Sequence, residues 1–336
     1  SANATNAASD RASLQSEGNQ HKLEIDRIAS TREFKGLKLL DGSDTAQTFQ
    51  VGANANQTIS VTMAAASTND LANNYVNAVN ATFDQGTAST TTPLANLPLN
   101  NTIAAQTLTV SGTLGSSTVS VSTGDSAYTI ASNVNAKEAS TGVTARAYNS
   151  ATLSNLSVDG TVTLTLGSGG STATISAAVT TTDLSALATE INKKTGTTGI
   201  SATVSGGTLT LTQADGKDIN VENFTHSTIN ATISLSAVDA SGAAVDPETL
   251  TTGVNDSAIV AGYVAFNSSS SFSVSSSIAA GAGSILNVAA GTAVGSSQSL
   301  VSEIDISSIS GALSAIAVVD AALKTIASQR ADLGAY

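Results

Sequence analysis

The sequence contains no cysteine and no tryptophan, and only 3% of its residues are aromatic. The absence of cysteine excludes disulfide bonds, thiolate zinc sites and catalytic thiols. Hydrophobic residues make up 41% of the chain, so its cores must be built from small layers of Ala, Val, Ile and Leu. At 336 residues the chain is long enough for two or three domains, and we expect several thin cores in place of one large one.

Charged residues are also scarce, at 11%, and acidic residues outnumber basic ones by 25 to 13. The resulting net charge of -12 disfavours nucleic acid and anionic membranes as partners. No uninterrupted apolar run approaches the roughly 18 residues that a membrane-spanning helix needs, and no signal peptide is visible at Ser1. We therefore expect neither nucleic-acid binding nor membrane insertion.

Residue patterns that carry catalysis or metal binding are missing as well. The two histidines, His21 and His226, lie far apart and in no metal-ligand spacing, and no serine has a G-x-S-x-G context. The D-G-K sequence that starts at Asp215 lacks the rest of a phosphate loop and predicts a hairpin turn. Asp215 and Asp218 could together help to hold a cation, but they lack the Asp/Asn spacing of a calcium loop. We predict that the protein is not an enzyme and has no cofactor or metal.

Both ends of the chain predict helices. Apolar or small residues recur every three or four positions in residues 8–31 and again near the C-terminus. They are Leu14, Gly18, His21, Ile25 and Ile28 in the first segment, and Ala312, Ile316, Val319, Leu323, Ile326, Arg330 and Leu333 in the second. The second set follows a heptad seam, so each helix needs a partner. We expect the two helices to pack on each other, with everything between them inserted; the alternative is that each packs on a local core.

The stretch EIDRIASTREFKGLKLLDG, residues 24–42, runs from the first helix into a Phe-Lys-Gly break, where Phe34 and Leu37 are expected to close the helix end. Turn signals follow at Asp41-Gly42 and at residues 52–56, flanked by TFQV and TISVTM. This pattern predicts one or two β-hairpins beside the helices.

The middle of the chain contains an internal repeat. TIASNVNAKEASTGVTARA, residues 129–147, aligns without gaps with ALATEINKKTGTTGISATV, residues 186–204. Each copy follows two strands with alternating polarity and precedes another strand, so the unit is two strands, a short helix and one or more strands. The β-rich return from ATISLSAVDA to SILNVAAG lacks the helical signature and is not a third copy.

Four blocks at the two ends resemble bacterial flagellins, in the same order and with similar spacing: SANATN, EIDRIASTREFKGLKLLDG, FQVGANANQTISV and GALSAIAVVDAALKTIASQRADLGA. The central repeat resembles a small motif inserted in flagellins and hook-associated proteins. The resemblance implies an α+β fold of elongated, multidomain form. Its expected parts are a helical rod domain with a β-hairpin formed by residues 1–100 and 296–336, a first β-rich repeat at 101–160, and a second repeat with the return segment at 161–295.

The same resemblance implies a function. We expect an extracellular structural subunit of the bacterial flagellar filament, which polymerises with copies of itself through the rod helices while the β-rich outer domains face solvent. Flagellins carry further terminal helices that form the filament core, so the chain is expected to be a truncated flagellin that does not polymerise by itself. Flagellar export and capping proteins are the expected partners of the full-length chain.

Candidate contact residues lie in the first helix and in the hairpin region: Glu24, Asp26, Arg27, Phe34, Gly52, Asn54 and Asn56. The first three form either a solvated helix face with local ion pairs or a contact with a neighbouring subunit. The resemblance also places them near the surface that animal Toll-like receptors bind on flagellins, although the companion helix of that surface is missing. The FQVGANANQTISV hairpin is expected to interlock subunits along the filament.

The alternative function is a cell-surface flagellin-like adhesin or polysaccharide-binding protein. Few aromatic residues are available in the β-rich outer domains to stack on sugars: Tyr128, Tyr148, Tyr263, Phe224, Phe266 and Phe272. An exposed cluster of these side chains would favour this alternative, and their burial would remove its main support.

Overall fold

The computed structural model describes residues 8–34, 36–43, 47–50, 58–61, 63–80, 82 and 85–335. The chain divides into two compact units. The helical unit comprises residues 1–75, 267–270 and 297–336, and the β-rich unit comprises residues 76–266 and 271–296. The first domain boundary predicted from the sequence lies at residue 100. The units instead divide after Tyr75, because the segment after it adds strand β6 (Ser89–Thr90) to a sheet of the β-rich unit, beside β17 (Ala258–Ala261).

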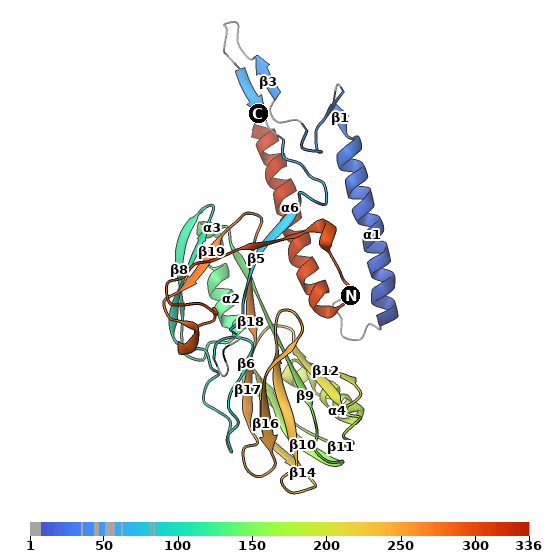
Figure 1. Ribbon diagram of the computed structural model, residues 1–336, viewed down its shortest axis with the longest axis vertical. Helices are drawn as coiled ribbons and strands as arrows, with labels where there is room; N and C mark the ends of the chain where they lie inside the picture. The colour runs from blue at the N-terminus through green and yellow to red at the C-terminus, as the bar shows by residue number, and fades with distance from the viewer. Residues whose placement is uncertain are drawn as a thin grey trace. The chain divides into compact units, whose positions relative to one another are not determined.

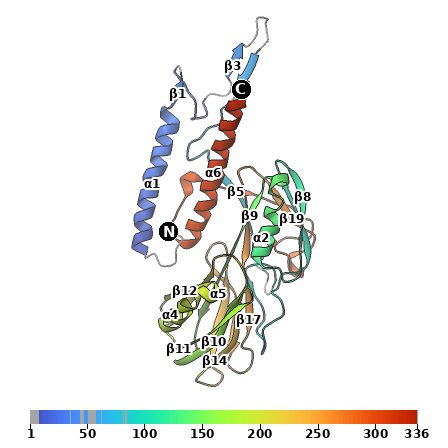
Figure 2. The ribbon, with the colours of Figure 1, turned by 180° about the vertical axis from the view of Figure 1, so that it is seen from behind.

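Helices α1 (Ala8–Thr31) and α6 (Ile309–Ala335) form most of the helical unit, at the positions that the periodicity predicts. They run side by side in the same direction (Figures 1 and 2). One small core contains residues of both helices and of the segments beside them: Leu71, Val301, Val318 and Ala322, with Ile25, Ile304 and Ile326 packed against them. The two ends of the chain therefore share one core.

The buried face of α6 differs from the predicted heptad seam. The helix buries Ala312, Ala315, Ala317, Val318, Ala321 and Ala322. Of the predicted seam residues only Ala312 is buried, whereas Val319 is 46% exposed and Leu323 is 60% exposed. The expectation that the seam packs directly on α1 is wrong at these positions, because the adjacent alanine-rich face supplies the intramolecular contact.

The described part of the chain contains one helical segment, Ser310–Gly334, that is long and apolar enough to cross a membrane by length and composition. It passes this test although Asp320 and Lys324 interrupt its apolar residues. The core helices of water-soluble proteins meet the same criterion, and α6 contributes Val318 and Ala322 to the core of the helical unit.

Short strands complete the helical unit. After α1, strands β1 (Glu33–Phe34) and β2 (Leu37–Lys38) pair across Gly36, whose φ of 81° suits glycine. Strands β3 (Gln47–Gln50) and β4 (Thr58–Val61) form the predicted antiparallel hairpin. The first residues of β5 (Ala72–Ala78) pair with β21 (Ser297–Leu300), which runs into the 3-10 turn η2 (Val301–Glu303).

The β-rich unit contains three sheets. Their orders within this unit are β11-β10-β14-β17-β6, β12-β13-β9-β18 with β15 joining β9 to β16, and β20-β19-β7-β8. The remaining bounds are β7 (Gln106–Gly112), β8 (Gly115–Val121), α2 (Ala127–Asn135), α3 (Glu138–Thr141), β9 (Thr144–Ser154), β10 (Gly160–Ser168), β11 (Ser171–Val179), α4 (Ser185–Lys193), α5 (Thr195–Thr198), β12 (Ile200–Ser205), β13 (Thr208–Gln213), β14 (Ile219–His226), β15 (Thr232–Val238), β16 (Ala244–Thr251), β18 (Tyr263–Ser268), β19 (Ser273–Ser276), η1 (Ala280–Ala282) and β20 (Val294–Gly295). The protein is thus a mixed α and β structure in which strands predominate.

The two repeat copies adopt the same local structure. The first is β7, β8, α2, α3 and β9, and the second is β10, β11, α4, α5 and β12. Each helix pair buries equivalent side chains and ends at an equivalent left-handed glycine. The buried pairs are Ile130 with Leu187 and Val134 with Ile191, and the glycines are Gly142 (φ 74°) and Gly199 (φ 71°). The gapless alignment predicted from the sequence is therefore confirmed residue by residue.

One asparagine in each copy fastens the helix to the following strand. The Asn135 Nδ2 donates to the Ala145 carbonyl at 2.9 Å, and its Oδ1 accepts from the Ala145 N–H at 2.7 Å. Asn192 makes the same two bonds with Ala202, both at 2.8 Å. The side-chain amide thus mimics a strand partner for one residue of β9 or β12.

Replacing Asn192 with Ala is expected to lower the free energy of unfolding by about 1 to 2 kcal/mol, because two backbone groups of Ala202 lose their partner. Asn135→Ala should have a similar effect, since the geometry is the same. Urea unfolding followed by circular dichroism measures both, with Asn133→Ala on the exposed face of α2 as the control. A loss at Asn192 no larger than at Asn133 would contradict this role.

Candidate assembly surface

An apolar groove of about 450 Å³ lies in the helical unit between α1 and α6. Helix α1 contributes Ile25 and Ile28 to its walls, and α6 contributes Val319, Leu323, Ile326 and Leu333. Met63 and Leu71 also line the groove. Almost all of its lining is carbon, so the groove offers no catalytic or metal-binding chemistry.

The groove explains the heptad seam of α6. Five of the predicted seam residues line it, and three of the apolar ones, Val319, Leu323 and Leu333, remain at least 41% exposed. Apolar side chains that follow a helical period and stay open to solvent form a surface suited to another helix. Covering them would release about 25 cal/mol for each Å² of apolar surface buried.

Polar contacts hold α1 in place beside the groove. Gln15 bonds through both side-chain atoms to the chain before α6: its Nε2 donates to the Ile304 carbonyl at 3.2 Å and its Oε1 accepts from the Ile306 N–H at 2.7 Å. The Lys22 ammonium donates to the carbonyls of Ser302 and Ile304, each at 3.1 Å. These hydrogen bonds to backbone tie α1 to the segment that leads into α6.

The three helix residues singled out from the sequence divide into two kinds. Glu24 and Arg27 form a bidentate pair on the exposed face of α1, at 2.7 and 2.5 Å. This hydrogen bond lowers the pKa of Glu24 and raises the pKa of Arg27. The Asp26 carboxylate instead accepts from the Thr68 N–H and hydroxyl, at 2.8 and 2.9 Å. Asp26 therefore ties α1 to the segment before β5, a role that sequence reasoning missed.

The remaining candidates lie in the hairpin region. Phe34 is the last residue of β1, and its side chain is outside the described atoms. Gly52, Asn54 and Asn56 lie outside the described residues. Their contact role stays a prediction.

Aromatic side chains of the β-rich unit are mostly buried. Phe224, Phe266, Phe272 and Tyr263 belong to the buried set. Tyr148 packs against Tyr263 with ring centroids 5.3 Å apart, and burial raises the pKa of both phenols. Tyr128 is 48% exposed. Among the six aromatic residues considered above, no exposed cluster forms, which removes the main support for sugar stacking. Among the described residues, no group of three or more His, Cys, Asp or Glu is placed to hold a metal ion.

Comparisons with known proteins agree with the internal repeat. The family described as the flagellin hook IN motif matches twice, at residues 107–162 and 161–215. The chain is 37% identical over 155 residues to B-type flagellin of Pseudomonas aeruginosa, a match covering 44% of this chain and 30% of the relative. It is 39% identical over 112 residues to phase 2 flagellin of Salmonella typhimurium, covering 33% of this chain and 21% of the relative.

A solved structure of FliC from Burkholderia pseudomallei aligns with 99% of this chain and 86% of its own, at 17% identity and a TM-score of 0.35. The matches to the two curated relatives above span less than a third of each relative's length.

Proposed function

Because the chain is a flagellin-type protein, we propose that it is a structural subunit of the bacterial flagellar filament. It assembles through the helical unit and exposes the β-rich unit to solvent. The observation that carries this proposal is the groove between α1 and α6, whose apolar lining follows a helical repeat and is left open. No bound substrate or cofactor is needed for this role, and the protein acts by packing, not by catalysis.

The groove suits a helix of the flagellin polymer. Flagellins, which the sequence resembles, carry further terminal helices. A helix with apolar residues every three or four positions fits a groove with this apolar lining. The helical unit is then the rod domain that the sequence predicts. The exposed pair Glu24 and Arg27 is available to a neighbouring subunit, whereas Asp26 acts within its own chain. The hairpin of β3 and β4 remains the proposed contact along the filament.

The proposed location follows from the assembly. A flagellar filament lies outside the cell, so the subunit is exported, and export and capping proteins are the proposed partners of the longer chain. A Toll-like receptor contact at Glu24 and Arg27 also stays a proposal, supported by their exposure alone.

Electron microscopy tests the proposal. The chain extended by the terminal helices of a flagellin should form regular tubular filaments under conditions that polymerise flagellins. The same preparation without those helices is the control and should remain monomeric by sedimentation. An extended chain that stays monomeric would contradict the filament role and favour the alternative of a cell-surface adhesin, which a glycan array would then address.

A further inference from the structure

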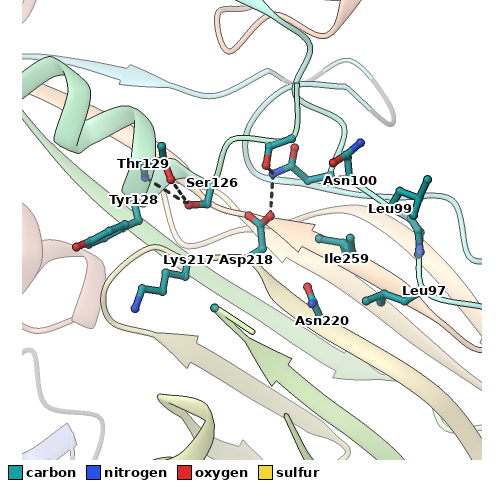
Figure 3. Close-up of a pocket in the computed structure, with 14 residues that line it drawn as sticks. Leu97, Leu99, Asn100, Ser126, Tyr128, Thr129, Lys217, Asp218, Asn220 and Ile259 are labelled. Atoms are coloured by element: carbon teal, nitrogen blue, oxygen red, sulfur yellow. Dashed lines mark hydrogen bonds between the residues drawn. The ribbon is translucent and has the colours of Figure 1, made fainter. Parts of the chain in front are cut away.

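A second pocket, of about 340 Å³, lies wholly within the β-rich unit (Figure 3). The loop of residues 97–101, the start of α2 and the start of β14 surround it. Its walls are of two kinds: the aliphatic side chains of Leu97, Leu99 and Ile259, and the polar side chains of Asn100, Asn220 and Asp218. The assembly role proposed above does not involve this pocket.

The Asp218 carboxyl is incompletely satisfied. Its Oδ2 accepts a hydrogen bond from the Asn101 Nδ2 at 2.8 Å, whereas its Oδ1 is enclosed and has no hydrogen-bond partner. The Asn101 amide has no further N–H for Asp218, because the same Nδ2 also donates to the carbonyls of Gly124 and Asp125, at 3.3 and 3.2 Å. An enclosed carboxylate oxygen without a donor is unfavourable, because it has lost its contact with water and gained no hydrogen bond in return.

No basic side chain drawn around the pocket neutralises this carboxyl. The neighbouring Lys217 turns the other way: its ammonium lies 3.6 Å from the Asp215 carboxylate and 5.2 Å from the centre of the Tyr128 ring. Figure 3 shows the Lys217 side chain extending away from Asp218. Burial raises the pKa of Asp218 to about 7, opposed by the Asn101 hydrogen bond and reinforced by the negative charge of Asp125. The pocket is therefore lined by one acidic group, Asp218, which has no cationic partner among the residues that line the pocket.

We propose that this pocket binds an alkylammonium group. The ammonium lies against Asp218, and the amide oxygens of Asn100 and Asn220 are placed around the same pocket to accept further N–H groups. The methylene stem of the ligand packs against the aliphatic side chains of Leu97 and Ile259, with which a bare metal ion would make no favourable contact. Lysine side chains of a partner protein and free polyamines share this chemistry.

Other ligand classes fit less well. An anion would meet the Asp218 carboxylate without compensation. Divalent cations such as calcium take six to eight oxygen ligands, and the described residues contain no group of three or more His, Cys, Asp or Glu placed for a metal. A charged amine needs one carboxylate and a few carbonyl oxygens.

The charge state of Asp218 predicts how binding varies with pH. An ammonium pairs with the ionised carboxylate, so protonation of Asp218 competes with the ligand. With a pKa of about 7, affinity should rise about tenfold between pH 6 and pH 8, while an alkylamine with a pKa near 10.4 stays charged. Binding that does not change over this range would contradict a contact with Asp218.

A ¹H–¹⁵N NMR titration of the chain with n-butylammonium chloride at pH 8 tests the proposal. Saturable shifts are expected for the amides of residues 97–101 and 217–220, and n-butanol, which has the same stem without the charge, should give none. Asp218→Asn should weaken binding at least tenfold, whereas Asp215→Asn, three residues away and exposed, should bind as the wild type does.

Parallel titrations with the amide of Nα-acetyl-lysine and with spermidine distinguish a side chain from a free polyamine by their relative affinity. Equal binding of butanol, unchanged binding by Asp218→Asn, or calcium chloride displacing butylammonium from the same amides would each overturn the assignment. Shifts that do not saturate would mean that water alone occupies the pocket.

Discussion

Replacing Leu323 with Asp is expected to abolish filament formation by the extended chain while leaving the fold of each unit intact. The Leu323 side chain is 60% exposed in the groove, so a surface substitution there should change the free energy of unfolding by about 0.5 kcal/mol or less. Once another helix covers the groove, the same carboxylate is removed from water among apolar side chains, which costs several kcal/mol. Loss of assembly without loss of stability is the signature of an interface residue.

Leu99 provides the matched control for this variant. It is also a leucine, is 98% exposed, belongs to the β-rich unit and is not among the residues that line the groove. Leu99→Asp should assemble as the unmodified chain does. Negative-stain electron microscopy and sedimentation measure assembly, and circular dichroism melting measures stability. Normal filaments from Leu323→Asp, or a melting temperature that falls together with assembly, would show that the groove is not the interface.

Local patterns in the sequence were sufficient to predict the helices and the repeat. The spacing of Ile25 and Ile28 in one helix, and of Val319 and Ile326 in the other, marks an apolar stripe, and both helices form where the stripes occur. The repeat could be aligned because equivalent positions such as Asn135 and Asn192 carry the same residue and make the same bonds. Signals of this kind depend only on neighbours within a few turns of the chain.

The covering of each stripe could not be predicted in the same way. Periodicity shows that a helix face is apolar without showing what packs on it. On α6 the alanines beside the seam, such as Ala315 and Ala322, are small enough to be buried or exposed, and they form the intramolecular contact while Leu323 faces the groove. The periodicity therefore marked the apolar residues of α6, whereas it did not show that Val319 and Leu323 stay exposed.

Contacts between distant segments were also beyond sequence reasoning. Thr68 donates a hydrogen bond to the Asp26 carboxylate, 42 residues away, and Asn101 donates one to Asp218, 117 residues away. Neither pair lies in a motif, because tertiary folding alone brings the partners together. Asp218 was considered as a cation ligand with Asp215, yet Asp215 pairs with Lys217 at 3.6 Å and takes no part in the pocket.

Asp218→Asn is expected to stabilise the β-rich unit at alkaline pH and to stabilise it clearly less at pH 5. In the unfolded chain this carboxyl has its ordinary pKa of 3.8, and folding raises the pKa to about 7. The folded state thus holds a proton that the unfolded state releases between these values, so stability contributed by the protonated group is lost as pH rises from about 4 to 7. Asparagine has the shape of the carboxyl group and carries no charge at any pH.

The size of the effect follows from the same linkage. A rise of the pKa from 3.8 to about 7 corresponds to roughly 4 kcal/mol at most. Because the Asp218 residue is only partly buried, the expected stabilisation at pH 8.5 is about 2 to 3 kcal/mol. Urea unfolding of the wild type and the variant at pH 5, 7 and 8.5 measures the difference in free energy of unfolding. Taking the difference cancels the pH-dependent contributions of other carboxyls, such as Asp183, whose pKa is lowered by hydrogen bonds from Ser185. Asp215→Asn should show no such trend, because that side chain is exposed. A stabilisation that is the same at pH 5 and pH 8.5 would mean that the carboxyl is not buried unpaired, and would also remove the electrostatic basis for an ammonium ligand in the pocket.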